Sequence, residues 1–356
     1  MRSFLAPLPV RPVEPADSAP TFSVIVAAYQ VADVVSDALE SIRRQTVPPW
    51  EVIVCDDGST DALEDALAPY RDEIVFVKTS HGGEAAAKNA AAARASGDFV
   101  VILDADDLYL PERLEALAEL ANARPDLDIL TTDAYLVVDG RRVRRNYDRR
   151  WLFEVVDQRR AILQRNFIFG HAAVRRERLL AHGGFDESIL WTTDWDLWLR
   201  LILDGSLAGV VAEPLALYRI RQSSLTARRR DLLIGKLTTL DKASRNDAVR
   251  SEERAVLALS IDAYRRELEL LELREALISG DALPRSRARR VLVCSEYSAK
   301  SRFEAAGMFL VPRLVAGLLR RRAAHSWVGA GGVRVSRRSG QGLLGRLARR
   351  TGADRG

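Results

Sequence analysis

Residues 82–107 read GGEAAAKNAAAARASGDFVVILDADD, and this stretch indicates the fold class. Two glycines open an alanine-rich segment, Glu84–Ser96, that predicts a helix ending at Gly97. The apolar run Phe99–Leu103 predicts a strand buried on both faces, as in a parallel sheet. That strand runs directly into an acidic turn, Asp104–Asp107, which places carboxylates at its carboxyl end.

The same alternation of strand and helix fills the preceding part of the chain. Apolar runs and helical spacing predict strands at Ser23–Ala28, Glu51–Cys55 and Ile74–Lys78, with helices at Asp33–Gln45 and Thr60–Leu67. This order predicts an α/β domain with a mostly parallel central sheet flanked by helices. Ligands bind such sheets outside the carboxyl ends of the strands. We therefore expect three turns to converge on one rim: Ala28-Tyr29, Asp56-Asp57 and Asp104–Asp107.

The remaining chain predicts further elements and a change of character. Helices are expected over Glu112–Ala123 and Asp194–Leu203, and Asp139-Gly140 is typical of a hairpin turn. A charged helical stretch with an apolar face follows over 229–280. The sequence therefore predicts a flexible leader at 1–20, the α/β domain at 21–228, a helical extension at 229–300 and a basic amphipathic tail at 301–356.

Charge is distributed unevenly along the 356 residues. The net charge is +4, but residues 311–356 hold eleven arginines and one acid, so the body of the chain is net acidic. Nucleic-acid-binding folds carry basic residues on the domain itself, so this pattern argues against nucleic acid as a partner.

Cysteine usage and hydropathy indicate the compartment. Cys55 and Cys294 lie far apart and offer no disulfide framework. The leader holds five prolines and no apolar core, unlike a signal peptide. No uncharged apolar run reaches the roughly 18–20 residues of a membrane span. These features predict a cytoplasmic protein, peripheral on the inner face of the membrane if its basic tail makes contact there.

Two common nucleotide-binding motifs are missing from the sequence. The first predicted strand-to-helix turn, Ala27–Ala32, holds no glycine, whereas a dinucleotide-binding turn needs glycines so that the backbone can approach a pyrophosphate. A P-loop is absent as well. These absences argue against an NAD-dependent dehydrogenase. The histidines show no metal-ligand spacing: His81, His171, His182 and His325.

The acidic turn Asp104–Asp107 has two interpretations. Mg²⁺ and Mn²⁺ prefer oxygen ligands, so carboxylates directly after a buried strand can hold such an ion against a diphosphate. Acidic loops are also common on solvated surfaces. The position at the carboxyl end of a strand, after three strand–helix units, favours the metal.

Asp194 has two interpretations that the residues alone leave open. It can cap the helix that follows, or it can be a general base on the edge of an aromatic pocket. Trp191, Trp195 and Trp198 supply the aromatic rings, although such rings are mostly core. Asp196, two residues further along the helix, is expected to point away and serve structure.

Taken together, these segments resemble glycosyltransferase family 2, whose members have the GT-A fold. The matching segments occur in the family's order: SVIVAAYQ at 23–30, VIVCDDGSTD at 52–61, the stretch at 82–107 and GGFDESILWTTDWDLWLRL at 183–201. They span about residues 21–226, and their joint occurrence is far more specific than a lone D-x-D.

The resemblance implies a role for each matching residue. It places Ala27, Ala28 and Tyr29 in the nucleotide pocket, Asp57 on the base, Lys88 facing the nucleotide and Asp104 facing the ribose and donor sugar. It makes Asp106, with Asp107, the metal ligands. Asp194 matches the catalytic base, and the glutamate that usually precedes it is Thr193 here.

The implied reaction is an inverting transfer of one sugar from a nucleoside-diphosphate sugar to an acceptor hydroxyl, with Mn²⁺ or Mg²⁺ as cofactor. The implied acceptor is a glycan or lipid-linked molecule in bacterial glycan or cell-surface polysaccharide synthesis. No Q-x-x-R-W motif follows Asp194, which argues against processive polymer synthesis. Two alternatives are a sugar-phosphate nucleotidyltransferase, whose Gly-rich basic loop is missing, and a non-catalytic membrane-surface module.

The C-terminal tail contains two segments that mix apolar and basic residues, Met308–Arg322 and Leu343–Arg350. Basic amphipathic helices lie at anionic membrane surfaces, and each cation adds on the order of 1 kcal/mol. We expect the tail to contact such a surface, with a solvated tail as the alternative.

Overall fold

The protein is described by a computed structural model, which covers residues 19–148, 151–220, 228–281, 284–329 and 333–336. The described residues divide into two compact units. The first holds the chain up to Ile220 together with Gly235–Asp262, and the second holds Arg221–Ile234 and the chain from Ala263 onward.

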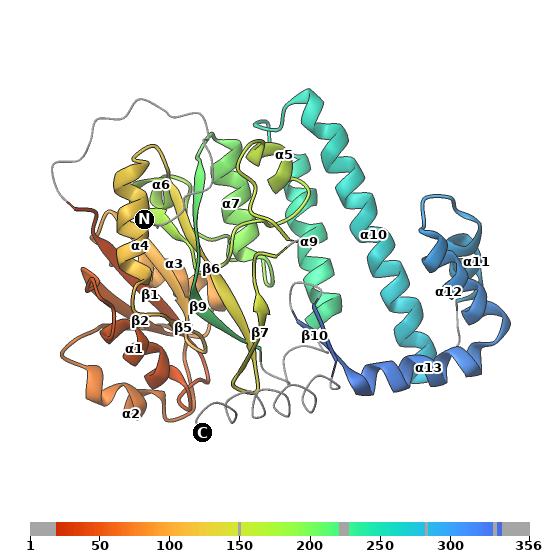
Figure 1. Cartoon of the computed structure of the whole chain (residues 1–356), viewed down its shortest axis with the longest axis horizontal. Helices are drawn as coiled ribbons and strands as arrows, with labels where there is room; N and C mark the ends of the chain where they lie inside the picture. The colour runs from red at the N-terminus through yellow and green to blue at the C-terminus, as the bar shows by residue number, and fades with distance from the viewer. Residues whose placement is uncertain (1–18, 149–150, 221–227, 282–283, 330–332, 337–356) are drawn as a thin grey trace, which may run out of the picture. The chain divides into compact units, whose positions relative to one another are not determined.

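A nine-stranded sheet forms the centre of the first unit (Figure 1). Its strands are β1 (Phe22–Ala28), β2 (Glu51–Asp56), β3 (Val75–Lys78), β4 (Phe99–Asp104), β5 (Leu108–Tyr109), β6 (Ile129–Val138), β7 (Arg141–Arg145), β8 (Ala173–Arg175) and β9 (Ala208–Ile220). They lie in the order β3-β2-β1-β4-β8-β6-β9-β5, and β7 pairs with β6.

The first four strands are parallel, as the sequence predicted. β1 pairs with β2 and β4, and β2 pairs with β3. β8 then enters antiparallel between β4 and β6, while β6 and β9 are parallel to each other. β6 and β9 are long strands, of ten and thirteen residues. The pairing of β6 with β9 shifts register on both sides of Asp133, which lies opposite Pro214, and then continues to the ends of the strands.

Helices flank this sheet. They are α1 (Val35–Arg43), α2 (Leu63–Leu67) with the 3₁₀ turn Ala68–Tyr70, α3 (Glu84–Ala92), α4 (Arg113–Ala123), α5 (Gln158–Ile162), α6 (Arg176–Ala181) and α7 (Thr193–Leu203). α3 ends earlier than predicted because the chain must turn into β4. At that turn a Cβ on Gly97 would lie 2.9 Å from Oγ of Ser23, so only glycine fits against β1.

The hydrophobic core of the first unit covers the central strand β1 on both faces. Val24, Ile25 and Val26 are fully buried, so β1 is covered on both faces, as its continuous apolar sequence predicted. Burying one such side chain stabilises the fold by about 1.5–3 kcal/mol. The strands therefore form a rigid platform for the turns at their carboxyl ends.

The C-terminal part of the chain is helical, as expected. It contains α9 (Arg228–Ser244), α10 (Ser251–Ser279), α11 (Arg285–Val293), α12 (Ala299–Leu310) and α13 (Pro312–His325), followed by the strands β10 (Ser326–Gly329) and β11 (Val333–Ser336). The second unit has its own core, in which Leu273 packs with Val291 and Met308. None of the described helices has the length and apolar character needed to cross a membrane.

Candidate active site

Three parallel strands end side by side at one rim of the sheet. In the ladder, Ala27 of β1 lies opposite Cys55 of β2 and Asp104 of β4. The turns that follow these strands therefore start next to one another. This is the convergence that the order of strands and helices predicted.

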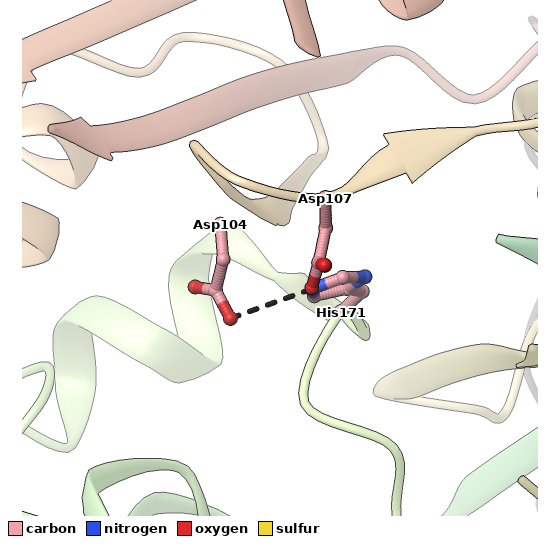
Figure 2. Close-up of side chains that lie close together, drawn as sticks. All are labelled: Asp104, Asp107 and His171. Carbon is pink, nitrogen blue, oxygen red and sulfur yellow. Dashed lines mark ion pairs between the residues drawn. The ribbon is translucent and has the colours of Figure 1, made fainter. Parts of the chain in front are cut away.

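Figure 2 shows three side chains gathered at this rim: Asp104, Asp107 and His171. Each offers a ligand atom, and these atoms lie within 4.8 Å of one another. Nε2 of His171 lies 2.9 Å from Oδ2 of Asp107 and 3.4 Å from Oδ2 of Asp104. His171 and Asp107 are each only 1% exposed. We call these three residues the acidic–histidine cluster.

Backbone contacts place the members of this cluster. The backbone N–H of Asp107 donates to the carbonyl of Asp104 at 2.9 Å, which closes a turn and brings the two carboxylates together. The backbone N–H of Arg219, near the end of β9, donates to Oδ1 of Asp107 at 2.6 Å. On the other side, the buried guanidinium of Arg113 donates to the carbonyl of His171.

Burial and charge set the protonation of the cluster. Burial raises the pKa of the Asp107 carboxyl to about 6, although the charge of His171 opposes this. Burial alone would lower the pKa of His171, but Asp107 and Asp104 outweigh it and raise that pKa to about 9. Burial also works against the charge of Asp104, yet Lys88 and His171 hold its pKa well below the usual range.

The cluster fits a divalent cation. Nδ1 of His171 is buried and makes no hydrogen bond within the described part of the chain. Nε2 of His171 and Oδ2 of Asp107 are buried as well, and each has the other as its ion-pair partner at 2.9 Å. Buried polar atoms normally have partners, and a cation that replaced the proton between Nε2 and Oδ2 would be a partner for both. Carboxylate oxygens with one imidazole nitrogen form a donor set that suits a divalent metal ion.

His171 is not among the metal ligands expected from the sequence, which are Asp106 and Asp107. The side chain of Asp106 is not part of the cluster, and its carbonyl accepts a hydrogen bond from Nε of Arg219. His171 lies far from the acidic turn in the sequence and in no spaced motif, which is why no local pattern indicated it. The pairing of β8 with β4 brings it there.

Lys88 of α3 lies against Asp104. Its Nζ is 3.0 Å from Oδ1 of Asp104, and it also pairs with Oε1 of Glu84 at 2.5 Å. The side chain is almost completely buried. Burial disfavours its charge, but the two carboxylates raise the pKa of Lys88 above its ordinary value. The predicted basic residue therefore stays charged at the end of β4.

Asp57 organises the loop before α3. Its Oδ1 accepts from the backbone N–H of Gly82 at 2.8 Å, and its Oδ2 accepts from Gly83 at 2.9 Å. Oδ2 also lies 2.8 Å from Nδ1 of His81, whose ring stacks on Tyr29 with centroids 4.1 Å apart. Asp57 is 2% exposed, so these contacts define the position of the loop.

The two alanines assigned to the nucleotide pocket differ in their surroundings. Ala27 is partly exposed at the end of β1. Ala28 is 1% exposed and belongs to the hydrophobic core. Its carbonyl accepts the backbone N–H of Asp57 at 2.9 Å. Tyr29 and Ala27 therefore have surface at the rim. Ala28 is buried, and only its backbone carbonyl takes part in the site, through the hydrogen bond with Asp57.

Asp194 is the second residue of α7, and the N-cap position is Thr192. Oδ1 of Asp194 accepts the backbone N–H of Trp195 at 2.7 Å, and Oδ2 accepts Nδ2 of Asn166 at 2.8 Å. Burial raises the pKa of this carboxyl to about 6, while the positive charge of Lys88 opposes the rise. Asn166 is a second residue that the sequence analysis did not name.

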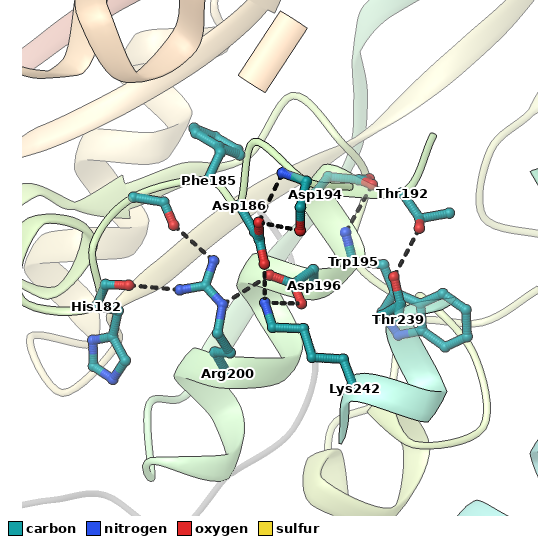
Figure 3. A network of polar contacts seen from close by, with 12 residues as sticks. His182, Phe185, Asp186, Thr192, Asp194, Trp195, Asp196, Arg200, Thr239 and Lys242 are labelled. Carbon is teal, nitrogen blue, oxygen red and sulfur yellow. Dashed lines mark hydrogen bonds and ion pairs between the residues drawn. The ribbon is translucent and has the colours of Figure 1, made fainter. Parts of the chain in front are cut away.

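Asp196 takes part in a separate polar network, shown in Figure 3. Its Oδ2 accepts from Nε of Arg200 at 2.8 Å, and its Oδ1 accepts from Nζ of Lys242 at 2.9 Å. Arg200 donates onward to the carbonyls of His182 and Gly184. These contacts tie α7 to α9 and to the loop before α7, in agreement with the structural role expected for Asp196.

The tryptophans around Asp194 are mainly core residues. Trp195 and Trp198 are 1% and 0% exposed. The indole N–H of Trp195 donates to the carbonyl of Ile162 at 2.8 Å, which anchors the start of α7. Trp191 alone of the three has substantial surface, at 37% exposed, so among these tryptophans it is the one whose ring can contact a ligand.

Comparison with known proteins identifies the relatives of this chain. The family model described as glycosyl transferase family 2 matches residues 23–183. The putative glycosyltransferase EpsE of Bacillus subtilis is 30% identical over 222 residues, which is 60% of this chain and 77% of EpsE. The chain spans 60% of the length of an uncharacterised glycosyltransferase of Rickettsia typhi, with 29% identity over 192 residues.

Two solved structures share the fold at lower sequence identity. S. aureus TarS 1–349 in complex with UDP-GlcNAc gives a TM-score of 0.57 at 18% identity, covering 87% of this chain and 95% of that one. The mannosyltransferase PcManGT of Pyrobaculum calidifontis, in complex with GDP-Man and Mn²⁺, gives 0.56 at 21% identity, covering 88% and 90%. The predicted GT-A architecture is therefore confirmed.

Proposed function

The chain belongs to glycosyltransferase family 2, and we propose that it transfers a single sugar from a nucleoside-diphosphate donor to an acceptor hydroxyl with inversion at the anomeric carbon. The observation that supports this most is the presence of two groups with different chemistry. Lys88 and a cation held by the acidic–histidine cluster would place positive charge beside a diphosphate. The carboxylate of Asp194 is separate from that cluster and has a pKa raised to about 6.

The proposed donor site lies along the rim of β1, β2 and β4. Tyr29 and Ala27 line the nucleotide pocket beside Ala28, and Asp57 positions the loop that meets the base. Asp104 faces the ribose and donor sugar, with Lys88 next to it. The stacked rings of Tyr29 and His81 support this assignment, since an aromatic surface at the rim suits a nucleobase.

We propose that Asp104, Asp107 and His171 hold the divalent cation, with Asp106 as the further ligand that the family resemblance implies. Mn²⁺ or Mg²⁺, when bound, would neutralise the charge of the departing diphosphate. PcManGT, which shares the fold, was solved in complex with GDP-Man and Mn²⁺, and this supports a divalent cation in the proposed reaction. Arg219 and Arg113 keep the carboxylate of Asp107 and the backbone of His171 in place.

In the proposed reaction, Asp194 takes the proton of the acceptor hydroxyl. The acceptor oxygen forms a bond to the anomeric carbon on the face opposite the diphosphate. The bond from that carbon to the diphosphate oxygen breaks, and the nucleoside diphosphate leaves with the bonding electrons. A general base with a pKa near 6 is mostly ionised at neutral pH and still able to accept a proton, which suits this step.

The proposed setting is bacterial glycan or cell-surface polysaccharide synthesis in the cytoplasm, with a glycan or lipid-linked acceptor. We also propose contact with an anionic membrane surface through the second unit. Leu314 and Leu318 lie one turn apart on α13 and are 64% and 52% exposed, and Val311, directly before this helix, is 48% exposed. Met308 lies in the core instead. The segment Leu343–Arg350 lies outside the described residues.

A pair of matched variants tests the membrane proposal. Replacing Leu314 and Leu318 with Asp should release the protein from phosphatidylglycerol vesicles at low salt in a co-sedimentation assay. Replacing Leu259 of α10, a leucine that is 68% exposed, with Asp should leave vesicle binding unchanged. If the full-length protein does not sediment with these vesicles, membrane contact is ruled out.

The experiment that tests the proposed reaction is a donor screen with purified protein and Mn²⁺. UDP-, GDP- and dTDP-sugars are supplied in turn, and release of the free nucleoside diphosphate is measured. The proposal expects release from one class of donor that depends on the metal. A sugar-phosphate nucleotidyltransferase would instead release pyrophosphate from a nucleoside triphosphate, and a non-catalytic module would give no turnover with any donor.

A further inference from the structure

A short segment, 166–170, lies between α5 and His171 and is held firmly. Its three central residues, Phe167–Phe169, are buried. The hydroxyl of Tyr147 donates to the carbonyl of Phe167 at 3.0 Å and accepts the backbone N–H of Phe169 at 2.9 Å. The segment therefore has little freedom to move, and it ends next to the acidic–histidine cluster.

The side chain of Asn166, at the start of this segment, has a defined orientation. Its Oδ1 accepts the backbone N–H of Ile168 at 3.2 Å. A backbone N–H can only donate, so the oxygen of the amide must face Ile168 and the NH₂ group must face the other way. That NH₂ group donates to Oδ2 of Asp194 at 2.8 Å.

The carboxylate of Asp194 is therefore held from two directions. Asn166 binds Oδ2, and the backbone N–H of Trp195 binds Oδ1 at 2.7 Å. Each oxygen keeps a lone pair that these contacts do not use.

We propose that Asn166 is a positioning residue for sugar transfer: its amide holds the carboxylate of Asp194 in the orientation from which it takes the acceptor proton. This inference rests on the proposed role of Asp194. Because the segment that begins with Asn166 runs directly into His171, it also fixes the place of the base relative to the acidic–histidine cluster.

Asn166→Asp is the sharpest variant for this proposal. It keeps the size of the side chain and the acceptor for Ile168, but it replaces the amide donor to Asp194 with a second carboxyl, which disfavours the ionised form of Asp194. Misplacing a reacting group by about 1 Å can cost around 100-fold in rate. We expect kcat for nucleoside-diphosphate release, with the donor found in the screen, to fall by about 10- to 100-fold. The KM for that donor should stay within about twofold, since Asn166 is not assigned to the donor site.

Asn246 supplies a matched control. Its Oδ1 also accepts a backbone N–H two residues ahead, that of Ala248 at 2.9 Å, in the loop between α9 and α10. Asn246→Asp should keep the wild-type kcat. If Asn166→Asp also keeps kcat within about twofold, the positioning role is wrong, and Asn166 contributes only the local hydrogen bond with the backbone N–H of Ile168.

A double-mutant cycle separates this inference from the proposed function. If Asn166 acts through Asp194, adding Asn166→Asp to Asp194→Asn should change the residual rate by less than about twofold. A full further loss on that background would overturn the inference, because Asn166 would then act independently. If Asp194→Asn alone keeps the wild-type rate, the base assignment itself fails, and this inference fails with it.

Discussion

Nε2 of His171 lies 2.9 Å from Oδ2 of Asp107, and both residues are buried. Two such groups side by side form an ion pair in the free protein. The same two atoms can instead coordinate a shared cation, with a carboxylate oxygen of Asp104 as the third ligand. This pair is the part of the rim that most directly links the fold to the proposed metal-dependent chemistry.

Removing the imidazole should remove the effect of the metal. We expect His171→Ala to reduce the Mn²⁺-dependent gain in nucleoside-diphosphate affinity by at least about tenfold, as measured by calorimetry with and without metal. His182→Ala is the control, since His182 pairs with Asp204 away from the rim. Unchanged metal dependence in His171→Ala would contradict the proposed ligand set.

The family resemblance implies Asp106, with Asp107, as metal ligands, whereas the structure places Asp107 beside His171 and leaves the side chain of Asp106 outside the acidic–histidine cluster. If the resemblance is followed, Asp106→Ala should abolish the Mn²⁺-dependent gain in affinity for the nucleoside diphosphate. The geometry of the acidic–histidine cluster expects Asp107→Ala to do so, since Asp107 lies beside His171. The same titration on both variants decides which carboxylate holds the metal.

The parallel half of the fold could be predicted from the sequence because buried parallel strands have continuous apolar sequences. The runs that form β1, β2 and β4 and the turns that follow them needed no other information. His171 could not be predicted in the same way. It is placed by β8, an antiparallel strand of three residues whose Ala173 pairs with Val101 of β4. A strand that short has no periodicity to detect.

Asp194 illustrates a second limit of the sequence. A carboxylate at the start of a helix serves as a cap or as a base, and the local sequence is the same in both cases. The structure places the N-cap at Thr192, and it brings Asn166 against Asp194 through a buried segment. Neither contact has a sequence signature, since each depends on how α5, α7 and β8 pack together.

The rate of transfer should depend on pH through Asp194. Burial raises the pKa of this carboxyl to about 6, and only its ionised form can accept a proton. At saturating metal and donor, kcat should therefore be level above pH 7, fall to about half at pH 6 and drop about tenfold per unit below that. An Asp with an ordinary pKa near 3.9 would keep kcat level down to about pH 5. A level profile to that pH would contradict this assignment.

Lys88 should matter for both stability and donor binding. Lys88→Met would remove the cation 3.0 Å from Asp104, whose side chain is 36% exposed and keeps His171 nearby. The loss of stability should therefore stay below that of breaking a fully buried pair, which is about 3–5 kcal/mol. We expect a lower melting temperature and a donor KM raised by at least about tenfold. Lys78→Met is the matched control, because Lys78 is about half-exposed in its pair with Glu64. Equal effects of the two variants would argue against a specific role for Lys88.

Asp196 should contribute to stability and not to chemistry. Asp196→Asn weakens the buried contacts with Arg200 and Lys242, which we expect to cost about 3 kcal/mol in the free energy of unfolding. The rate per folded molecule should stay within about twofold of the wild type. Thermal unfolding and initial rates measured on the same preparation check both expectations, and a large loss of rate in stable protein would contradict them.

The most direct test of the proposed mechanism is the rate of sugar transfer by Asp194→Asn, measured beside its affinity for the nucleoside diphosphate with Mn²⁺. Positioned general bases contribute about 10²- to 10⁴-fold in rate. We predict that the variant keeps metal-dependent nucleotide binding and loses transfer by about that factor. A variant that binds nucleotide normally and still transfers sugar at the wild-type rate would show that Asp194 is not the base.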